Sequence, residues 1–151
     1  MRCPSCGQQN NHVLESREVD EGLAVRRRRE CNKCGSRYTT YERVEINRLL
    51  IVKKSGERQP YSRDKLAKGV YRAFEKRPIA IEEIELLISR VENQLQVNGK
   101  SELQSSVLGE IVSSEIKNLD PVAYVRFASV YKSFSDLSSF EEELSKMRNE
   151  Q

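Results

Sequence analysis

Four cysteines near the N-terminus have the residue type and the spacing of a metal-binding set. They form two CxxC pairs separated by 24 residues, with a glycine after each pair: Cys3, Cys6 and Gly7, then Cys31, Cys34 and Gly35. A tight turn at each pair aims two sulfurs at one point, and four thiolates about 2.3 Å from a central ion satisfy tetrahedral Zn²⁺. Such a closed set leaves no open coordination position, so we expect one structural zinc per chain rather than a catalytic one.

Other uses of these cysteines remain open from spacing alone. A rubredoxin-like iron takes the same four ligands, and a thioredoxin-type protein uses a CxxC for redox chemistry. The redox motif comes once, within a βαβ unit, whereas this chain has two pairs that flank a β-rich segment. The single histidine, His12, is interpreted as a surface residue rather than a ligand.

An arginine run leads directly into the second cysteine pair. Residues 1–48 hold ten Arg or Lys and seven Asp or Glu, whereas the remainder holds sixteen of each, so the whole net charge of +3 lies beside the cysteines. Alternate residues of a strand face opposite ways, so Arg26 and Arg28 share one side and the other two arginines share the opposite side. This pattern favours contacts with the phosphates and guanines of DNA or RNA, with a solvated or protein-binding face as the alternative. The candidate DNA-binding residues are Arg17, Arg26, Arg27, Arg28, Arg29 and Arg37.

The sequence around the cysteines predicts a small antiparallel sheet that positions these side chains. Residues 13–19 and 23–26 are predicted strands, joined by a short loop that contains Gly22, and the β-formers at 37–41 supply a third strand. Arg17 and Arg37 lie on the two strands that could flank the arginine run. Because so small a module cannot bury a core of its own, we expect metal binding to supply its folding free energy.

The pattern changes near residue 48 to a second, mostly helical domain. Residues 49–54 and 59–61 predict a short β-hairpin, and apolar residues at helical spacing then mark four helices. The start and stop signals of these helices are N-caps at Ser62 and at Asp120, the latter followed by Pro121, and a C-terminal stop at Asn98 and Gly99.

A fifth, polar helix is predicted at 140–148, because Ser139 stands at capping-box spacing from Glu142. No apolar run approaches the roughly 18 residues that span a bilayer, and the first residues do not form a signal peptide. We therefore expect a cytoplasmic protein with no membrane partner.

Cations gather where the hairpin meets the first helix of this domain. Lys53 and Lys54 end the first strand, while Arg63, Lys65 and Lys68 occupy the first turns of the helix. Beside the free N–H groups of a helix N-terminus such a cluster could hold a polyphosphate, although solvated lysines would give the same pattern. The sequence has no Walker motif, no GxGxxG and no Ser/His/Asp set, so we predict that the protein is not an enzyme.

Two unrelated motif sets, in one order from Met1 to about Phe134, resemble the bacterial NrdR family, which represses ribonucleotide reductase genes. The residues that carry the resemblance are Cys3-Pro4-x-Cys6, Arg26–Arg29, Cys31-x-x-Cys34, Arg37–Glu42, Val52–Gly56, Ser62-Arg63-x-Lys65 and Val122–Tyr131.

The resemblance implies an α+β fold: a small antiparallel zinc ribbon, followed by a mostly α-helical ATP-cone with a short β-hairpin. The predicted boundaries are 1–46 for the ribbon, 49–139 for the ATP-cone and 140–151 for a C-terminal helix or tail. By position, the nucleotide contacts would fall on Ile51, Lys53, Lys54, Lys65 and Tyr131. The family pattern usually has Arg at the position of Lys54, and lysine lacks the bidentate fork of arginine.

The resemblance also implies a mechanism. The family binds ATP and dATP in the cone, changes its oligomeric state with the ligand, and binds paired operator boxes in double-stranded DNA. We therefore expect a homo-oligomer that joins the nucleoid when bound to DNA, and we expect the dATP-loaded form to repress. Two other classes remain as alternatives: a detached allosteric domain of a reductase, and a protein-binding zinc-ribbon adaptor.

Overall fold

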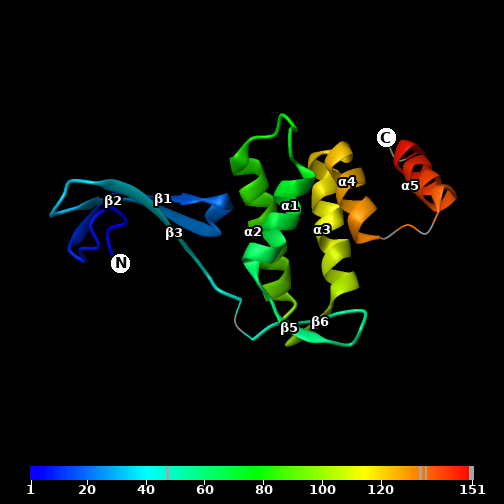
Figure 1. Ribbon diagram of the computed structural model, residues 1–151, viewed down its shortest axis with the longest axis horizontal. Helices are drawn as coiled ribbons and strands as arrows, with labels where there is room; N and C mark the ends of the chain where they lie inside the picture. Colours follow the sequence, from blue (N-terminus) through cyan, green and yellow to red (C-terminus); the bar gives the residue numbers. More distant parts are fainter. Residues whose placement is uncertain (47, 133, 135, 150–151) are drawn as a thin grey trace. The chain divides into compact units, whose positions relative to one another are not determined.

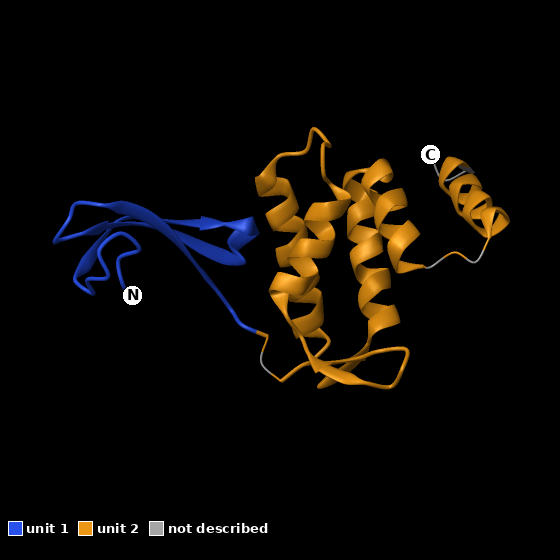
Figure 2. Cartoon of the chain, viewed as in Figure 1, with its two compact units in different colours: residues 1–45 blue, residues 46–151 orange. Residues whose placement is uncertain are grey.

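The computed structural model describes residues 1–151 except 47, 133, 135 and 150–151, so the last two residues of the predicted tail lie outside the description. The chain divides into two compact units, residues 1–45 and residues 46–151 (Figure 2). Each unit contains its own three-stranded sheet (Figure 1). Among the described helices, none combines the length and the apolar character needed to cross a bilayer.

The first unit is an antiparallel sheet with the strand order β1-β2-β3. Its strands are β1 (Asn11–Val19), β2 (Ala24–Cys31) and β3 (Arg37–Arg43). The loop predicted between the first two strands is a single 3₁₀ turn, Asp20–Gly22. Strand β2 extends beyond the predicted end at residue 26, because its backbone pairs through the arginine run with β1 as far as Cys31 and with β3 as far as Glu30.

The second unit begins with a three-stranded sheet that holds the predicted hairpin. Strand β4 (Leu50–Val52) pairs antiparallel with β5 (Arg58–Pro60), and it also pairs in parallel with β6 (Glu102–Gln104). The sequence predicted the hairpin but not β6, which is three residues long and lies between two helices. Because β6 precedes the third helix, its pairing with β4 fixes the start of that helix beside the hairpin.

The described chain contains five α-helices, and the predicted signals at Ser62, Asn98 and Asp120 lie at helix ends, whereas the one at Ser139 does not. They are α1 (Arg63–Ala73), α2 (Ile81–Val97), α3 (Ser105–Leu119), α4 (Pro121–Tyr131) and α5 (Leu137–Asn149). The predicted N-cap of α1 is confirmed, because the Ser62 Oγ accepts a hydrogen bond from the Lys65 N–H at 3.4 Å. The predicted cap of α5 is wrong: Asp136 Oδ1 accepts from the Ser139 N–H at 2.8 Å, so the helix starts before Ser139.

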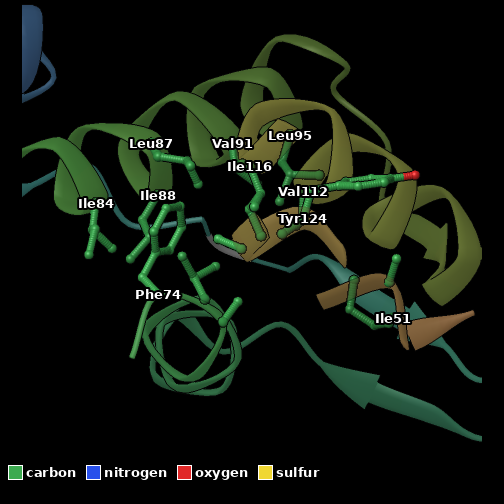
Figure 3. Close-up of a cluster of buried hydrophobic side chains, with 14 of the residues drawn as sticks. Ile51, Phe74, Ile84, Leu87, Ile88, Val91, Leu95, Val112, Ile116 and Tyr124 are labelled. Carbon is green, nitrogen blue, oxygen red and sulfur yellow. The ribbon is translucent and has the colours of Figure 1, made fainter. Parts of the chain in front are cut away.

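Helices α1 to α4 enclose one apolar core (Figure 3). The side chains of Val70, Ile88, Val91 and Ile116 are fully inaccessible to solvent. They come from α1, α2 and α3, where apolar residues recur every three or four positions and so form one face of each helix. Burying each such side chain stabilises the fold by about 1.5–3 kcal/mol, before the cost in chain entropy.

A buried carboxylate fixes the start of α4. Asp120 is 4% exposed; its Oδ1 accepts from the N–H groups of Val122 at 2.8 Å and Ala123 at 3.0 Å, and its Oδ2 accepts from Arg77 at 2.8 Å. Burial raises the pKa of this carboxyl, but the two N–H groups and the Arg77 guanidinium outweigh it and hold the pKa below its usual 3.8.

Asp120→Ala should lower the free energy of unfolding of the second unit by about 1–3 kcal/mol, because it removes the cap and leaves Arg77 without its anion. Asp120→Asn keeps a capping oxygen and should recover part of this loss. Since the folded pKa is depressed, the contribution is present above about pH 4 and is lost as the pH falls through the folded pKa. Urea unfolding followed by helical circular dichroism, at pH 7 and pH 3, measures these differences. An Asn variant as unstable as the Ala variant would assign the effect to the ion pair alone.

Candidate functional site

The two CxxC turns have the same backbone geometry. The Gly7 N–H donates to the Cys3 carbonyl at 2.9 Å, and the Gly35 N–H donates to the Cys31 carbonyl at 2.9 Å. Gly7 has φ +70° and Gly35 has φ +69°, a left-handed conformation that glycine adopts without steric cost. The glycine after each pair therefore closes the turn, as the sequence predicted.

The four sulfurs lie at distances that fit a tetrahedral zinc. All four Sγ atoms are within 4.8 Å of one another, with 3.7 Å between Cys3 and Cys34 and 3.6 Å between Cys6 and Cys31. Ligands about 2.3 Å from a metal at tetrahedral angles are about 3.8 Å apart. Both pairs converge on one point, which is the arrangement of a metal site rather than of a dithiol redox pair.

The ionisation of these thiols also favours a bound cation. Burial raises the pKa of the Cys3 thiol, but hydrogen bonds from the backbone N–H of Cys6 and from neighbouring sulfurs lower it to about 6. The backbone N–H of Ser36 lowers the pKa of Cys34, but the nearby sulfurs, with Cys6 the largest contributor, raise it to about 12. Crowded thiolates repel one another, so the full set of four ionises only when a cation offsets their charge.

One face of the ribbon sheet carries three arginines that make no ion pair with any residue the structure describes. Arg17 lies directly opposite Arg26 across the β1–β2 pair, and Arg28 lies on the same face two residues further along β2. Tyr41, which is 50% exposed, stands opposite Arg26 on β3. This surface, the arginine face, presents three cations and an aromatic ring, with the exposed Glu15 opposite Arg28 on the same face.

The other two arginines of the run are bound within the sheet. The Arg27 Nη2 donates to the Glu42 Oε2 at 3.0 Å. The Arg29 guanidinium donates to the Thr40 Oγ1 at 3.1 Å and to the Asn11 Oδ1 at 3.2 Å. The predicted alternation along the strand is confirmed, and the side that contains Arg27 and Arg29 is hydrogen-bonded within the sheet.

Arg37 shares the arginine face by register but has a partner on it. Its Nε donates to the Glu30 Oε2 at 2.6 Å, and this guanidinium holds the pKa of the Glu30 carboxyl below its usual value. The structure therefore brings Arg17, Arg26 and Arg28 together as a group and places the other three predicted arginines in pairs.

A β-bulge decides on which face Arg17 lies. The register of β1 against β2 shifts between Val13 and Glu15, so that Asn11 pairs with Cys31 while Arg17 pairs with Arg26. Continuous pairing from Asn11 would have placed Arg17 opposite Val25, on the face of the bound arginines. The sequence has no turn residue at this point that would have predicted the bulge.

The second unit contains a cavity of about 200 Å³ between the hairpin and helices α1, α3 and α4. Three of the five predicted nucleotide-binding residues line it: Ile51, Lys53 and Lys65. Lys65 Nζ donates to the Gln59 Oε1 at 3.3 Å, which places its ammonium group at the cavity wall. The predicted convergence of the strand end and the helix start is therefore present.

Two helices begin at this cavity. Ser62 and Lys65 line it from the first turn of α1, while Ser105 and Gly109 line it from the first turns of α3. At α3 the N-cap residue, Gln104, makes no side-chain capping hydrogen bond within the described chain. Unsatisfied N–H groups and the positive ends of helix dipoles favour an anion, and the two lysines add full positive charges.

Other predicted cations and Tyr131 lie outside this cavity. Lys54 is not among its lining residues. Arg63 is turned toward α2, where it forms ion pairs with Glu92 and, at 2.8 Å, with Glu85. The Tyr131 hydroxyl donates to the Ser106 carbonyl, and its ring lines a neighbouring groove instead.

Sequence reasoning missed the contribution of α3 to the cavity. Ser105 and Gly109 reach it because β6 pairs with β4, and a strand of three residues gives too short a pattern to recognise. Gly109 offered a signal, because a glycine inside an apolar helix indicates a close approach by another group. A Cβ there would overlap the Tyr131 ring, so that ring packs directly on the helix backbone.

Comparison with known proteins assigns both units to families. Residues 1–42 match the family described as "Transcriptional repressor NrdR-like, N-terminal domain", and residues 49–137 match the family described as "ATP cone domain". Proteins called "Transcriptional repressor NrdR" are similar over nearly their full lengths. The one from Acetivibrio thermocellus is 49% identical over 150 residues and 99% of each chain. One from Listeria monocytogenes is 51% identical over 144 residues, which is 95% of this chain and 94% of the relative.

Purified under reducing conditions, the chain should contain about one zinc ion. Cys31→Ser should lose the metal and the amide protection of the first unit, because metal binding supplies the folding free energy of that unit. Elemental analysis and hydrogen exchange measure both effects. Ser36→Ala is the matched control, since Ser36 lies beside the same turn and bonds Ser5 at 2.8 Å without being a ligand. A metal-free chain with a protected ribbon would contradict the zinc site.

Proposed function

The chain belongs to the NrdR family of transcriptional repressors, and we propose from this premise that its zinc ribbon binds operator DNA while ATP or dATP in the cone controls its assembly. The observation that carries the proposal is the presence of two separate sites in one chain. A ribbon face holds three arginines without internal partners, and a separate cavity gathers two lysines with the starts of two helices.

The arginine face supports the DNA half of the proposal. The major groove admits a two-stranded ribbon, and arginine binds both phosphates and the O6 and N7 atoms of guanine. Arg17, Arg26 and Arg28 project from two adjacent strands, so their spacing is set by the sheet rather than by a flexible loop. A pre-positioned guanidinium loses less conformational entropy on binding than a mobile one.

The cavity supports the nucleotide half. Its volume of about 200 Å³ suits part of a nucleotide, with the remainder exposed at the hairpin. Lys53 and Lys65 would contact the phosphates, and the N–H groups at the start of α3 would add hydrogen bonds. Ile51 and Leu66 give the cavity an apolar wall of the kind that contacts a base or ribose.

The regulatory logic follows from linkage. A nucleotide shifts an assembly equilibrium only by the difference between its affinities for the two states. ATP and dATP differ by one ribose hydroxyl, so the two ligands act differently only where that hydroxyl meets the protein or another ligand. We propose that the dATP-loaded form represses, since an excess of dATP signals that deoxynucleotide synthesis can stop.

Removing Arg26 and Arg28 together should weaken DNA binding and flatten its salt dependence. Eliminating one phosphate contact reduces the log–log slope by about 0.9, so the slope of the double Ala variant should fall by up to about 1.8. Fluorescence anisotropy over a salt series, with a duplex enriched from a randomised library by the wild-type chain, provides the measurement.

The control for this experiment removes the same charge elsewhere. Lys146 and Arg148 lie exposed on α5, and their double Ala variant should keep the wild-type affinity and slope. If both double variants behave alike, the arginine face is not the binding surface and net charge alone explains the affinity.

Lys53→Ala and Lys65→Ala should each weaken ATP and dATP binding about 5- to 150-fold, because the cavity loses a cation that offsets the phosphate charge. Isothermal titration calorimetry gives the dissociation constants. Lys54→Ala is the matched comparison, since Lys54 adjoins Lys53 in sequence but does not line the cavity, and its effect on affinity should be smaller. An equal effect at all three positions would indicate general electrostatics and contradict the proposed site.

A further inference from the structure

A cluster of polar side chains ties the start of α1 to α2, beside the cavity of the second unit. The Glu92 carboxylate, which comes from α2, accepts hydrogen bonds from two residues at once. The Tyr61 hydroxyl donates to its Oε1 at 3.0 Å, and the Arg63 guanidinium donates to its Oε2. Arg63 also donates to the Glu85 Oε2 at 2.8 Å. We call Tyr61, Arg63, Glu85 and Glu92 the Glu92 cluster.

The contacts of the Glu92 cluster are largely shielded from water. Helices α1 and α2 pack side by side (Figure 1), and Glu85 and Glu92, two helical turns apart, both face α1. The Glu92 side chain is 13% exposed and that of Arg63 is 25% exposed, so this ion pair is held more firmly than one on the surface. Burial, followed by the charge of Glu92, raises the pKa of the Tyr61 phenol, which therefore stays protonated and donates.

The Glu92 cluster fixes the rotation of the first turn of α1. Successive residues of an α-helix are about 100° apart, so Arg63 and Lys65 point in nearly opposite directions. Because Arg63 binds the glutamates of α2, Lys65 lies on the other side of the helix, where it lines the cavity. In α1, which the structure describes throughout, the buried residues are Val70 and Ala73, both in its second half. No buried apolar side chain therefore holds the first turn.

Both neighbours of the α1 N-cap belong to the Glu92 cluster. Ser62 lies between Tyr61 and Arg63 in the chain, and it lines the cavity. Its Oγ accepts from the Lys65 N–H at 3.4 Å, and the Lys65 Nζ donates to the Gln59 Oε1 at 3.3 Å. A displacement of Tyr61 or Arg63 therefore moves the cap and the lysine together.

We propose that Glu92 is a positioning residue for the nucleotide site: by holding Tyr61 and Arg63, it keeps the Lys65 ammonium group where it meets the phosphates. The inference rests on the proposed function, since it takes the cavity as the nucleotide site. Glu92 is not among the residues that line the cavity, so its effect on binding passes through the first turn of α1.

A double-mutant comparison separates positioning from simple stabilisation of the fold. An ion pair that only stabilises the fold changes the fraction of folded chain and not the affinity of the folded chain. Residues that are distant and share no partner act additively, whereas residues that act through one another do not. If Glu92 acts through Lys65, its removal weakens binding in a chain that has Lys65 and hardly matters in a chain that lacks it.

Glu92→Ala should weaken ATP and dATP binding about tenfold in the wild-type background, and less than about twofold in the Lys65→Ala background. Glu92→Gln keeps the side-chain shape and an acceptor for the Tyr61 hydroxyl, so its affinity should fall between those of the wild type and Glu92→Ala. Isothermal titration calorimetry on the full-length chain gives the dissociation constants, at a temperature where circular dichroism shows every variant folded. If Glu92→Ala does not fold, the same comparison is made with Glu92→Gln in both backgrounds.

The control and the outcomes separate this inference from the proposed function. Glu82→Ala removes the same charge from an exposed position on the same helix, away from the cavity lining, and should bind like the wild type. Equal losses from the Glu92 substitution in both backgrounds overturn the inference, as does wild-type affinity in both Glu92 variants. Either result leaves the nucleotide site standing. A wild-type chain that binds neither nucleotide removes the proposed function itself.

Discussion

The convergence of four cysteine sulfurs on one point is the interaction on which the first unit of the protein depends. Among the described residues of the first unit, the buried apolar side chains are Cys3, Ala24 and Cys31, which is too little to hold a sheet together. The same sheet carries three arginines whose charges repel one another. Structural zinc sites contribute about 10–16 kcal/mol in small zinc modules, which is ample to offset both deficits. Metal ligation thus allows a face of unpaired cations to stay rigid without a hydrophobic core beneath it.

Strand alternation then divides one run of arginines between the two faces of the sheet. Arg27 and Arg29 hold β1, β2 and β3 together through Glu42, Thr40 and Asn11, while the opposite face keeps its guanidinium groups available. The alternation followed from the sequence, because a strand has a period of two. The sequence did not predict which face would keep its arginines unpaired. The residues that bind Arg27 and Arg29 come from other strands, and Arg17 lies opposite Arg26 only because of a bulge. Local periodicity predicts which residues share a face, whereas long-range pairing decides what that face can do.

In the second unit, too, the features set by neighbouring residues were predicted from the sequence, and those set by distant residues were not. The hairpin, the helix stripes and the caps at Ser62 and Asp120 depend on residues a few positions apart, and each was predicted from the sequence. Strand β6 joins β4 across some fifty residues, and its three residues have no pattern of their own. That one pairing brings α3 to the cavity and adds its N-terminus to the lysines. Arg63 illustrates the converse, since it stands among the predicted cations but is neutralised by glutamates from α2.

The proposed nucleotide-controlled assembly bears on how a small chemical difference can have a large regulatory effect. Moving an equilibrium from 1:99 to 99:1 requires about 5.5 kcal/mol of differential binding, or about 10⁴-fold in affinity. One ribose hydroxyl seldom provides that much, since a single hydrogen bond contributes about 0.5–1.5 kcal/mol. In the proposed assembly two cones would supply two cavities, so each nucleotide would need only about 100-fold preference for the assembled state. Each further pair of cones in such an assembly would lower the demand per site again. Assembly is therefore the means by which a repressor of this design could amplify a weak molecular distinction.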